Sequence, residues 1–297
     1  MHSDCVAELA GVSKKFGKIV ALDGLDLEVR RGELFAVLGP NGAGKSTAIS
    51  ILLGLRRPDA GSVSVFGESP QNLSARRNVG VMMQEVALAQ ELRVHEQIDL
   101  AASYYPGPLS VAEVLELTHT TPLRDRPYGK LSAGQKRQTQ FAVAVCGRPK
   151  LLFLDEPTVG LDIQARETMW NVLRRLVAQG CSIVLTTHYL EEVEALADRV
   201  AVLARGRVIA SGTVSEIRAH VVRKHIGCRT TVAVEEVRSW PGVESVAGDP
   251  QRMQIRASNA EDVVRRLLAA DAELEALEVR RAGLSEAFAE LTQETIQ

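Results

Sequence analysis

Residues 39–46 read Gly-Pro-Asn-Gly-Ala-Gly-Lys-Ser, which fits the pattern G-x-x-x-x-G-K-[ST]. Glycines let such a loop curl until its N–H groups point at phosphate oxygens, and a following helix adds the positive end of its dipole. Lys45 is expected to place its charge between the β- and γ-phosphates of a nucleotide, and Ser46 to ligate Mg²⁺. A chance match in a glycine-rich turn is the alternative. The apolar run LFAVL before the loop and the helix-prone KSTAISILLGL after it favour the phosphate loop.

A pair of carboxylates, Asp155 and Glu156, follows the apolar run LLFL. Carboxylates at the carboxyl end of a buried strand face the crevice where α/β sheets bind ligands. Asp155 is therefore expected to hold Mg²⁺ through water, and Glu156 to polarise an attacking water as a general base. Two solvated turn residues before a proline are the alternative, which the phosphate loop disfavours.

Two more polar residues follow apolar runs. His188 comes after SIVLT, and Gln84 ends the run VGVMM. At the same edge of the sheet, His188 would contact a γ-phosphate, and Gln84 would sense Mg²⁺ or the attacking water. On these residues alone a structural histidine and a polar loop glutamine remain open alternatives.

The elements that must position these residues alternate along the chain. Up to about Gly212, short apolar strands alternate with helical stretches, which favours a mostly parallel α/β sheet. Strands buried on both faces are predicted at 34–38, 151–154 and 182–186. Between about 85 and 149 the strand signal fades. Helices predicted at 111–117 and 135–145 indicate a helical insertion there.

The tail from about Thr230 has a different pattern. Its predicted order, β-α-β-β-α-β, is that of a ferredoxin-like module. The predicted strands are 230–234, 243–247, 253–257 and 274–280, the helices are 235–240 and 260–270, and a final helix covers 284–292. We therefore predict a nucleotide-binding domain at 1–220, with its helical subdomain at about 85–149, and a small α+β accessory domain at 228–297.

Composition excludes several classes of protein. Among 297 residues, 35 cationic and 37 anionic side chains leave a net charge of −2, which disfavours a phosphate-backbone binder. Only 4% are aromatic, which disfavours a base-stacking platform. The uncharged stretch 100–112 contains prolines and, like the other uncharged stretches, is too short for the ~20 apolar residues of a membrane span. No signal peptide is predicted, and four scattered cysteines favour a reducing cytosol.

The segment LSAGQ at 131–135 joins these motifs into one set. Together with GPNGAGKST at 39–47, Gln84, LLFLDEP at 151–157, Gly-Leu-Asp at 160–162 and His188, it resembles the ATP-binding subunit of ATP-binding cassette (ABC) transporters over about residues 5–215. The resemblance implies the ABC-type P-loop fold, in which an antiparallel N-terminal β part lies beside the core sheet, and it implies ATP and Mg²⁺ as ligands.

The resemblance also assigns roles to individual residues. Catalysis would fall to Glu156, His188, Gln84 and Lys45, and the metal to Ser46, Gln84 and Asp155. ATP would be bound by Phe16, Gly39, Pro40, Asn41, Gly42, Ala43, Gly44, Lys45, Ser46, Thr47, Ser132, Gly134 and Gln135.

In this family the signature residues Ser132 and Gly134 face the γ-phosphate of ATP bound to the other subunit. The resemblance thus implies a homodimer that ATP closes and hydrolysis opens, driving a separate transmembrane permease. The chain departs from the family in Ala133, which replaces the first signature glycine, and in Phe16, which replaces the usual tyrosine. We expect both to be tolerated, since a phenyl ring still stacks on adenine.

The segments SGTVSEI at 211–217 and GLSEAFAELT at 283–292 resemble bacterial exporter ATPases of the daunorubicin-resistance type. That implies export, a six-helix permease contacted around 84–110, a position at the cytoplasmic face of the inner membrane, and no nucleic-acid partner. An importer ATPase, or a soluble ABC ATPase acting on ribosomes or DNA, is the alternative. The single P-loop and the lack of long heptads disfavour the soluble class. The tail would seal the dimer or bind a regulator.

Overall fold

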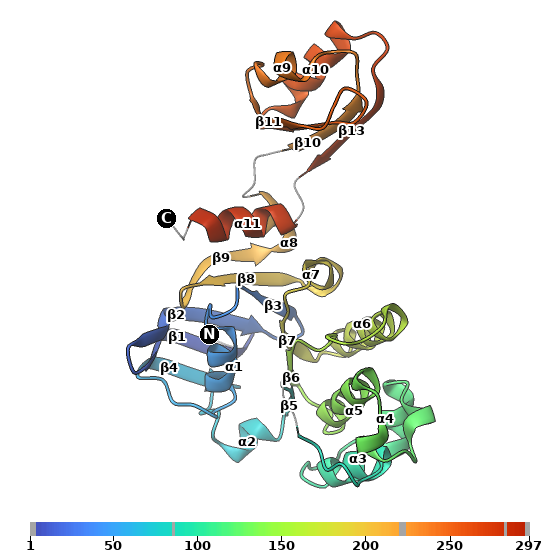
Figure 1. The fold of residues 1–297 in the computed structure, drawn as a ribbon. Coiled ribbons are helices and arrows are strands. Elements are labelled where there is room, and N and C mark those ends of the chain that lie inside the picture. The colour runs from blue at the N-terminus through green and yellow to red at the C-terminus, as the bar shows by residue number, and fades with distance from the viewer. Residues whose placement is uncertain (1–3, 85–86, 220–223, 282–283, 295–297) are drawn as a thin grey trace. The chain divides into compact units, whose positions relative to one another are not determined.

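The structure is a computed structural model that describes residues 4–84, 87–219, 224–281 and 284–294 (Figure 1). It divides into two compact units, Met1–Val214 and Ser215–Gln297. The sequence placed the end of the first domain near 220, whereas the contacts divide the chain after Val214.

Six strands form the core sheet of the first unit. Their order is β5 (Val79–Met82), β6 (Leu151–Asp155), β7 (Ser182–Thr186), β3 (Leu34–Leu38), β8 (Arg199–Ala204) and β9 (Arg207–Thr213). All neighbours pair in parallel except β8 and β9, which are antiparallel. Every residue of β3, β6 and β7 is buried, as the continuous apolar runs predicted. The mostly parallel core sheet is thus confirmed.

A second, antiparallel sheet is formed by β2 (Ile19–Arg30), β1 (Cys5–Phe16) and β4 (Ala60–Val65). Its inner face, helix α1 (Lys45–Leu52) and one face of the core sheet share a single apolar cluster, which includes Leu9, Leu22, Phe35, Ile51 and Phe153. The antiparallel N-terminal part that the resemblance implied is confirmed. Because the apolar cluster is buried between the two sheets and α1, it holds the start of α1 in a fixed place.

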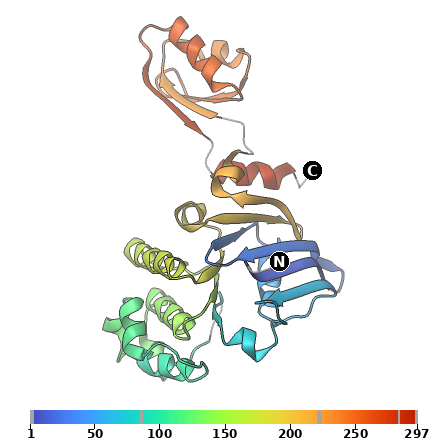
Figure 2. The ribbon, with the colours of Figure 1, turned by 180° about the vertical axis from the view of Figure 1, so that it is seen from behind.

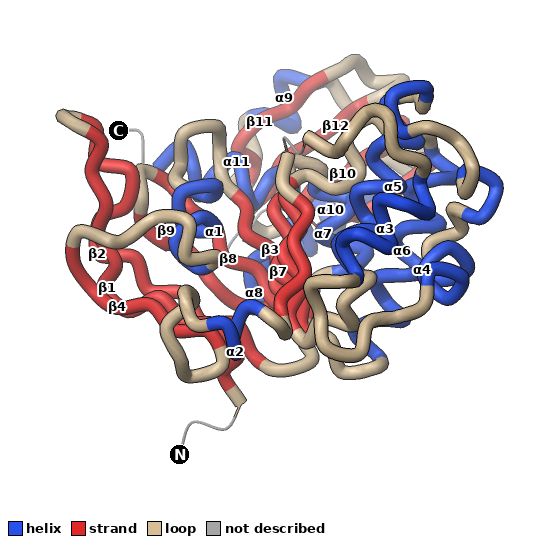
Figure 3. Tube along the Cα trace, turned by 90° about the horizontal axis from the view of Figure 1, so that it is seen from below, coloured by secondary structure: helices blue, strands red, loops and turns tan. Residues whose placement is uncertain are grey.

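Helices cover the other face of the core sheet. They are α3 (Val94–Ala102), α4 (Val111–Leu117), α5 (Ala133–Val145), α6 (Ile163–Ala178) and α7 (Leu190–Leu196), with α2 (Leu73–Arg76) before β5. The views in Figures 1, 2 and 3 all place these five helices and the N-terminal sheet on opposite sides of the core sheet. The predicted helix at 111–117 is confirmed. The one predicted at 135–145 begins at Ala133 because Ser132 caps it.

The second unit contains a four-stranded antiparallel sheet in the order β11-β12-β10-β13. Its elements are α8 (Val214–Ala219), β10 (Lys224–Arg229), α9 (Val234–Arg238), β11 (Val243–Ala247), β12 (Met253–Ala257), α10 (Ala260–Ala270), β13 (Glu275–Arg281) and α11 (Leu284–Glu294). From β10 to β13 the order is the predicted β-α-β-β-α-β.

One strand of this tail was predicted wrongly. The β-branched run at 230–234 is not a strand; the strand is β10, and α9 follows from Val234. Thr230 Oγ1 and the Thr231 N–H each donate to the Asp271 carboxylate at 2.6 Å, which turns the chain there. These bonds lower the pKa of Asp271 to about 2. None of the described helices has the length and hydropathy that a bilayer-spanning segment needs.

Candidate active site

Predicted site residues follow four adjacent parallel strands of the core sheet. Gln84 follows β5, Asp155 and Glu156 end β6, His188 follows β7, and the loop at 39–44 follows β3. Because the carboxyl ends of parallel strands lie at one edge, these residues gather on a single rim.

The loop at 39–44 has no room for side chains at two of its glycines. A Cβ on Gly39 would lie 2.5 Å from the Leu203 carbonyl oxygen, and one on Gly44 would lie 2.6 Å from that of Ala21. Gly44, with φ 107°, is the N-cap of α1, and no side chain caps that end in the described chain. The first N–H groups of α1 are therefore available to an anion.

Other loop residues differ in exposure. Pro40, Asn41, Gly42 and Ser46 are exposed, Thr47 is half-buried and Ala43 is buried. The exposed residues thus line the open side of the loop.

Lys45 folds back over this loop. Its Nζ donates to the carbonyl oxygens of Gly39, at 2.6 Å, and Pro40, at 3.1 Å. Burial lowers the pKa of Lys45, and the carboxylates of Glu156 and Asp155 act against that shift. The ammonium group therefore shares the electrostatic field of the two carboxylates at the end of β6.

Asp155 and Glu156 are both buried and are held from β7. Thr186 Oγ1 donates a short hydrogen bond to Asp155 Oδ1, and the Glu156 N–H donates to the Thr186 carbonyl at 2.9 Å. Glu156 has a φ of 52°, a left-handed conformation that is uncommon for a side chain of this size. Such backbones persist where the surroundings enforce them, often at functional sites.

His188 lies beside Glu156. Its Nδ1 is 2.7 Å from Glu156 Oε2, while 57% of the histidine side chain is exposed. The histidine ring also packs on Tyr189, with 4.1 Å between the ring centroids. The carboxylate is thus buried and aimed, and the imidazole connects it to solvent.

Thr186 and Glu192 were missed by the sequence analysis. Glu192, on α7, is fully buried and accepts a hydrogen bond from Trp170 Nε1 at 3.1 Å. Burial raises the pKa of Glu192, and Thr187, Trp170 and Thr158 oppose that shift. The sequence offered one indication of Thr186, which belongs to a pair of threonines directly before His188. It offered no indication of Glu192, which lies in a polar helical stretch.

Two of the predicted site residues, Gln84 and Phe16, make few contacts with the rest of the rim. The Gln84 side chain is exposed, and across the described ranges no hydrogen bond from it is found; only its carbonyl is engaged. Phe16, at the end of β1, is 39% exposed, with Arg56 Cζ 5.0 Å and Lys14 Nζ 5.8 Å from its ring centroid.

The signature segment begins α5. Ser132 and Gln135 cap each other reciprocally, with Oγ accepting from the Gln135 N–H at 3.3 Å. A Cβ on Gly134 would lie 3.1 Å from the Gly160 carbonyl oxygen, while Ala133 is exposed. Figures 1 and 2 show α5 and α1, which begins at the phosphate loop, on opposite sides of the core sheet.

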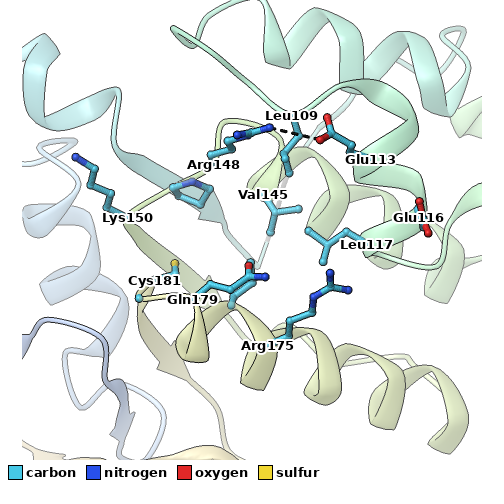
Figure 4. A pocket seen from close by; sticks show the side chains of 13 residues that line it. Leu109, Glu113, Glu116, Leu117, Val145, Arg148, Lys150, Arg175, Gln179 and Cys181 are labelled. Carbon is cyan, nitrogen blue, oxygen red and sulfur yellow. Dashed lines mark hydrogen bonds and ion pairs between the residues drawn. The ribbon is translucent and has the colours of Figure 1, made fainter.

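A separate cavity of about 490 Å³ lies at the opposite edge of the sheet (Figure 4). Lys150 and Cys181, which precede β6 and β7, line it together with Glu113 of α4 and Arg175 of α6. Two of the lining side chains, Arg148 and Glu113, form an ion pair of 3.4 Å. This cavity is not part of the rim that gathers the predicted residues.

Comparison with known proteins agrees with this geometry. A family model described as "ABC transporter" matches residues 22–159. The chain is 39% identical over 258 residues to the Nod factor export ATP-binding protein I of Rhizobium sp. (strain N33), covering 84% of this chain and 80% of that protein. It is 35% identical over 309 residues to the daunorubicin resistance ATP-binding protein DrrA3 of Streptomyces coeruleorubidus, covering 98% and 96%.

Solved structures are similar as well. The structure of an ATP-binding subunit of an ABC transporter matches with a TM-score of 0.67 and 31% identity, covering 72% of this chain and 92% of that one. An ATP-binding cassette in a dimeric post-hydrolysis state, bound to ADP and Pi, matches with a TM-score of 0.64 and 25% identity, covering 70% and 98%.

Proposed function

The chain belongs to the ABC transporter family as an ATP-binding subunit, and from this premise we propose that it powers export through a separate membrane permease. Hydrolysis of ATP is the activity of the family. Export is supported by the two relatives above, one named for Nod factor export and one for daunorubicin resistance. The second relative matches across nearly the whole chain, including the second unit.

The observation that carries the catalytic assignment is the buried Glu156 beside His188. A carboxylate held 2.7 Å from a solvent-facing imidazole can take a proton from water and pass it outward. Lys45, whose charge shares the field of both carboxylates, would bind the β- and γ-phosphates. The N–H groups at the start of α1 would hold the remaining phosphate oxygens.

Mg²⁺ fits the residues at this rim. No cluster of three or more His, Cys, Asp or Glu side chains able to hold a metal occurs in the described part of the chain. Mg²⁺ in nucleotide sites usually keeps several waters and takes few protein ligands besides phosphate. Ser46, which is exposed, and Asp155, which Thr186 orients, would hold it, with Gln84 approaching when ATP is present. The ion would neutralise charge on the transferring phosphoryl group.

The position of α5, across the core sheet from α1, supports a homodimer. The α5 N-terminus offers N–H groups to an anion, and a second copy would supply that anion as its γ-phosphate. The similar cassette solved as a dimer supports the same arrangement. ATP would then be bound between two chains and would separate them when cleaved.

An exposed apolar surface supports the permease contact. Adjoining hollows of about 310 and 390 Å³ share Val81 and Tyr105. Leu100 and Tyr104, on and just after α3, are 50% and 75% exposed beside them. Large exposed apolar groups of this kind mark interaction sites. We propose that a permease segment docks here, which would hold the chain at the cytoplasmic face of the inner membrane. We propose no nucleic-acid partner.

The test is phosphate release by the purified chain, with Mg²⁺ and with EDTA in its place. Hydrolysis that needs Mg²⁺ and rises when the permease is added supports the proposal. Tyr104→Ala should leave basal hydrolysis intact and remove the permease stimulation. Hydrolysis that is insensitive to EDTA, or stimulation unaffected by Tyr104→Ala, would count against the metal site or the docking surface respectively.

A further inference from the structure

Arg137 of α5 is a buried cation whose hydrogen bonds within the described residues go to backbone carbonyls and one side-chain amide. Arg137 comes two residues after Gln135 in the sequence, and it is 7% exposed. It donates to the carbonyl oxygens of Met83 (3.0 Å), Gln84 (3.2 Å), Asp155 (2.6 Å), Glu156 (2.6 Å) and Pro157 (3.3 Å), and to Oε1 of Gln140 (3.0 Å). One guanidinium therefore joins three segments that are far apart in sequence.

These bonds account for all the donor groups of the side chain. Nε serves Pro157, one terminal nitrogen serves the Met83–Gln84 turn, and the other serves Asp155 and Glu156. Burial lowers the pKa of Arg137, and the charges of Asp155 and Glu156 act against that shift. Burying a charge costs free energy unless its hydrogen bonds are made, so Arg137 can stay buried only while these acceptors keep their positions.

Only a guanidinium can make this connection. Its planar fork offers five N–H groups in fixed directions, whereas a lysine ammonium is a compact point charge with three. A lysine at 137 would keep the positive charge, but a single nitrogen could not serve the Met83–Gln84 turn and the Asp155–Pro157 turn together.

The hydrogen bonds of Arg137 also hold the backbone of Glu156, which has a left-handed conformation. Its backbone is held on one side by Thr186 and on the other by Arg137, which accounts for a φ of 52° at this position. The direction of the Glu156 side chain is set by this backbone. Because Arg137 belongs to α5, a rotation of this helix would shift the backbone of Glu156 and of the Gln84 turn together. Helix α5 starts at the signature segment.

We propose that Arg137 is a positioning residue that couples the orientation of the signature helix α5 to the backbone carrying Glu156 and to the Gln84 turn. This inference rests on the role of Glu156 proposed above. Arg137 touches neither nucleotide nor water in this role. It acts by keeping the general base aimed.

The test separates turnover from binding. Misplacement of a catalytic group by about 1 Å costs on the order of 100-fold in rate. Arg137→Lys should therefore lower kcat by at least about tenfold, with the KM for ATP and the dissociation constant of ADP nearly unchanged. The matched control is Arg174→Lys on α6, where a guanidinium also serves a carbonyl, that of Ala195, but remote from the rim. It should keep the wild-type kcat.

A second variant covers the case in which lysine disturbs folding. Arg137→Ala leaves space for a free guanidinium, and millimolar methylguanidinium should restore a measurable part of kcat without raising the melting temperature. A folded Arg137→Lys variant with wild-type kcat, or one that loses kcat and nucleotide affinity in parallel, would overturn the inference. Failure of both variants to fold, or absence of methylguanidinium rescue in Arg137→Ala, would overturn it as well. Absence of hydrolysis in the wild type would instead overturn the proposed function.

Discussion

His188 Nδ1 lies 2.7 Å from Oε2 of Glu156, and the two residues come from the ends of adjacent strands, β7 and β6. The carboxylate is buried and the imidazole is half exposed, so the pair forms a path from the interior of the rim to solvent. The carbonyl of Thr186, the last residue of the strand that precedes His188, fixes the Glu156 backbone. The relationship between the two side chains is thus built into the sheet register.

Removing the imidazole should impair turnover more than binding. His188→Ala is expected to lower kcat at least about tenfold, because a positioned proton-transfer partner contributes about 100-fold or more. The KM for ATP should change by less. Steady-state phosphate release measures both. Tyr189→Phe keeps the ring next to His188 and serves as the control; a kcat loss equal to that of His188→Ala would show that packing, not the imidazole, matters.

Removing the loop lysine should act on affinity first. Hydrogen bonds to a charged group contribute about 1.5–3 kcal/mol, which corresponds to roughly a 10- to 100-fold weaker dissociation constant. Lys45→Ala should show this loss in equilibrium titration with MgATP. Lys150→Ala removes a cation at the opposite edge of the sheet and should bind normally. Wild-type affinity in Lys45→Ala would argue against contact between Lys45 and phosphate.

The signature serine should matter only across the dimer. Ser132→Arg places a long side chain where the γ-phosphate of the partner copy is expected, so turnover should be abolished while ATP still binds to the phosphate loop. Ser132→Thr keeps the hydroxyl that caps α5 and should keep most of the activity. Full hydrolysis by Ser132→Arg would contradict a composite site.

Glu192 predicts a pH dependence of stability. Burial raises its pKa, so the folded state holds a proton that the unfolded state has released above about pH 4.3. The free energy of unfolding therefore falls as the pH rises from that value through the raised pKa. Glu192→Gln should remove this fall while keeping an acceptor for Trp170. Melting temperatures at pH 5 and pH 8 test it; an identical pH dependence in both proteins would contradict the assignment.

The sequence predicted the elements that carry the candidate site better than the contacts that hold them together. Buried strands such as β3 and β7 are continuous apolar runs, and the phosphate loop has a fixed spacing, so both are readable from the chain. Strand β10 was missed because KHIGCR mixes charges and a glycine, whereas the β-branched run after it is turned by Asp271. Arg137 was missed because a buried cation in a polar helix resembles a solvated one.

The central claim is that two copies of this chain bind ATP between them and that Glu156 drives the hydrolysis that separates them. Glu156→Gln keeps the size of the side chain but removes the base, so hydrolysis should fall by at least about 100-fold while ATP binding persists. The direct measurement is the molar mass of Glu156→Gln in solution, by light scattering, with and without MgATP. We predict that MgATP doubles the mass and that ATP stays bound uncleaved. A monomer under both conditions, or hydrolysis at the wild-type rate, would contradict the account.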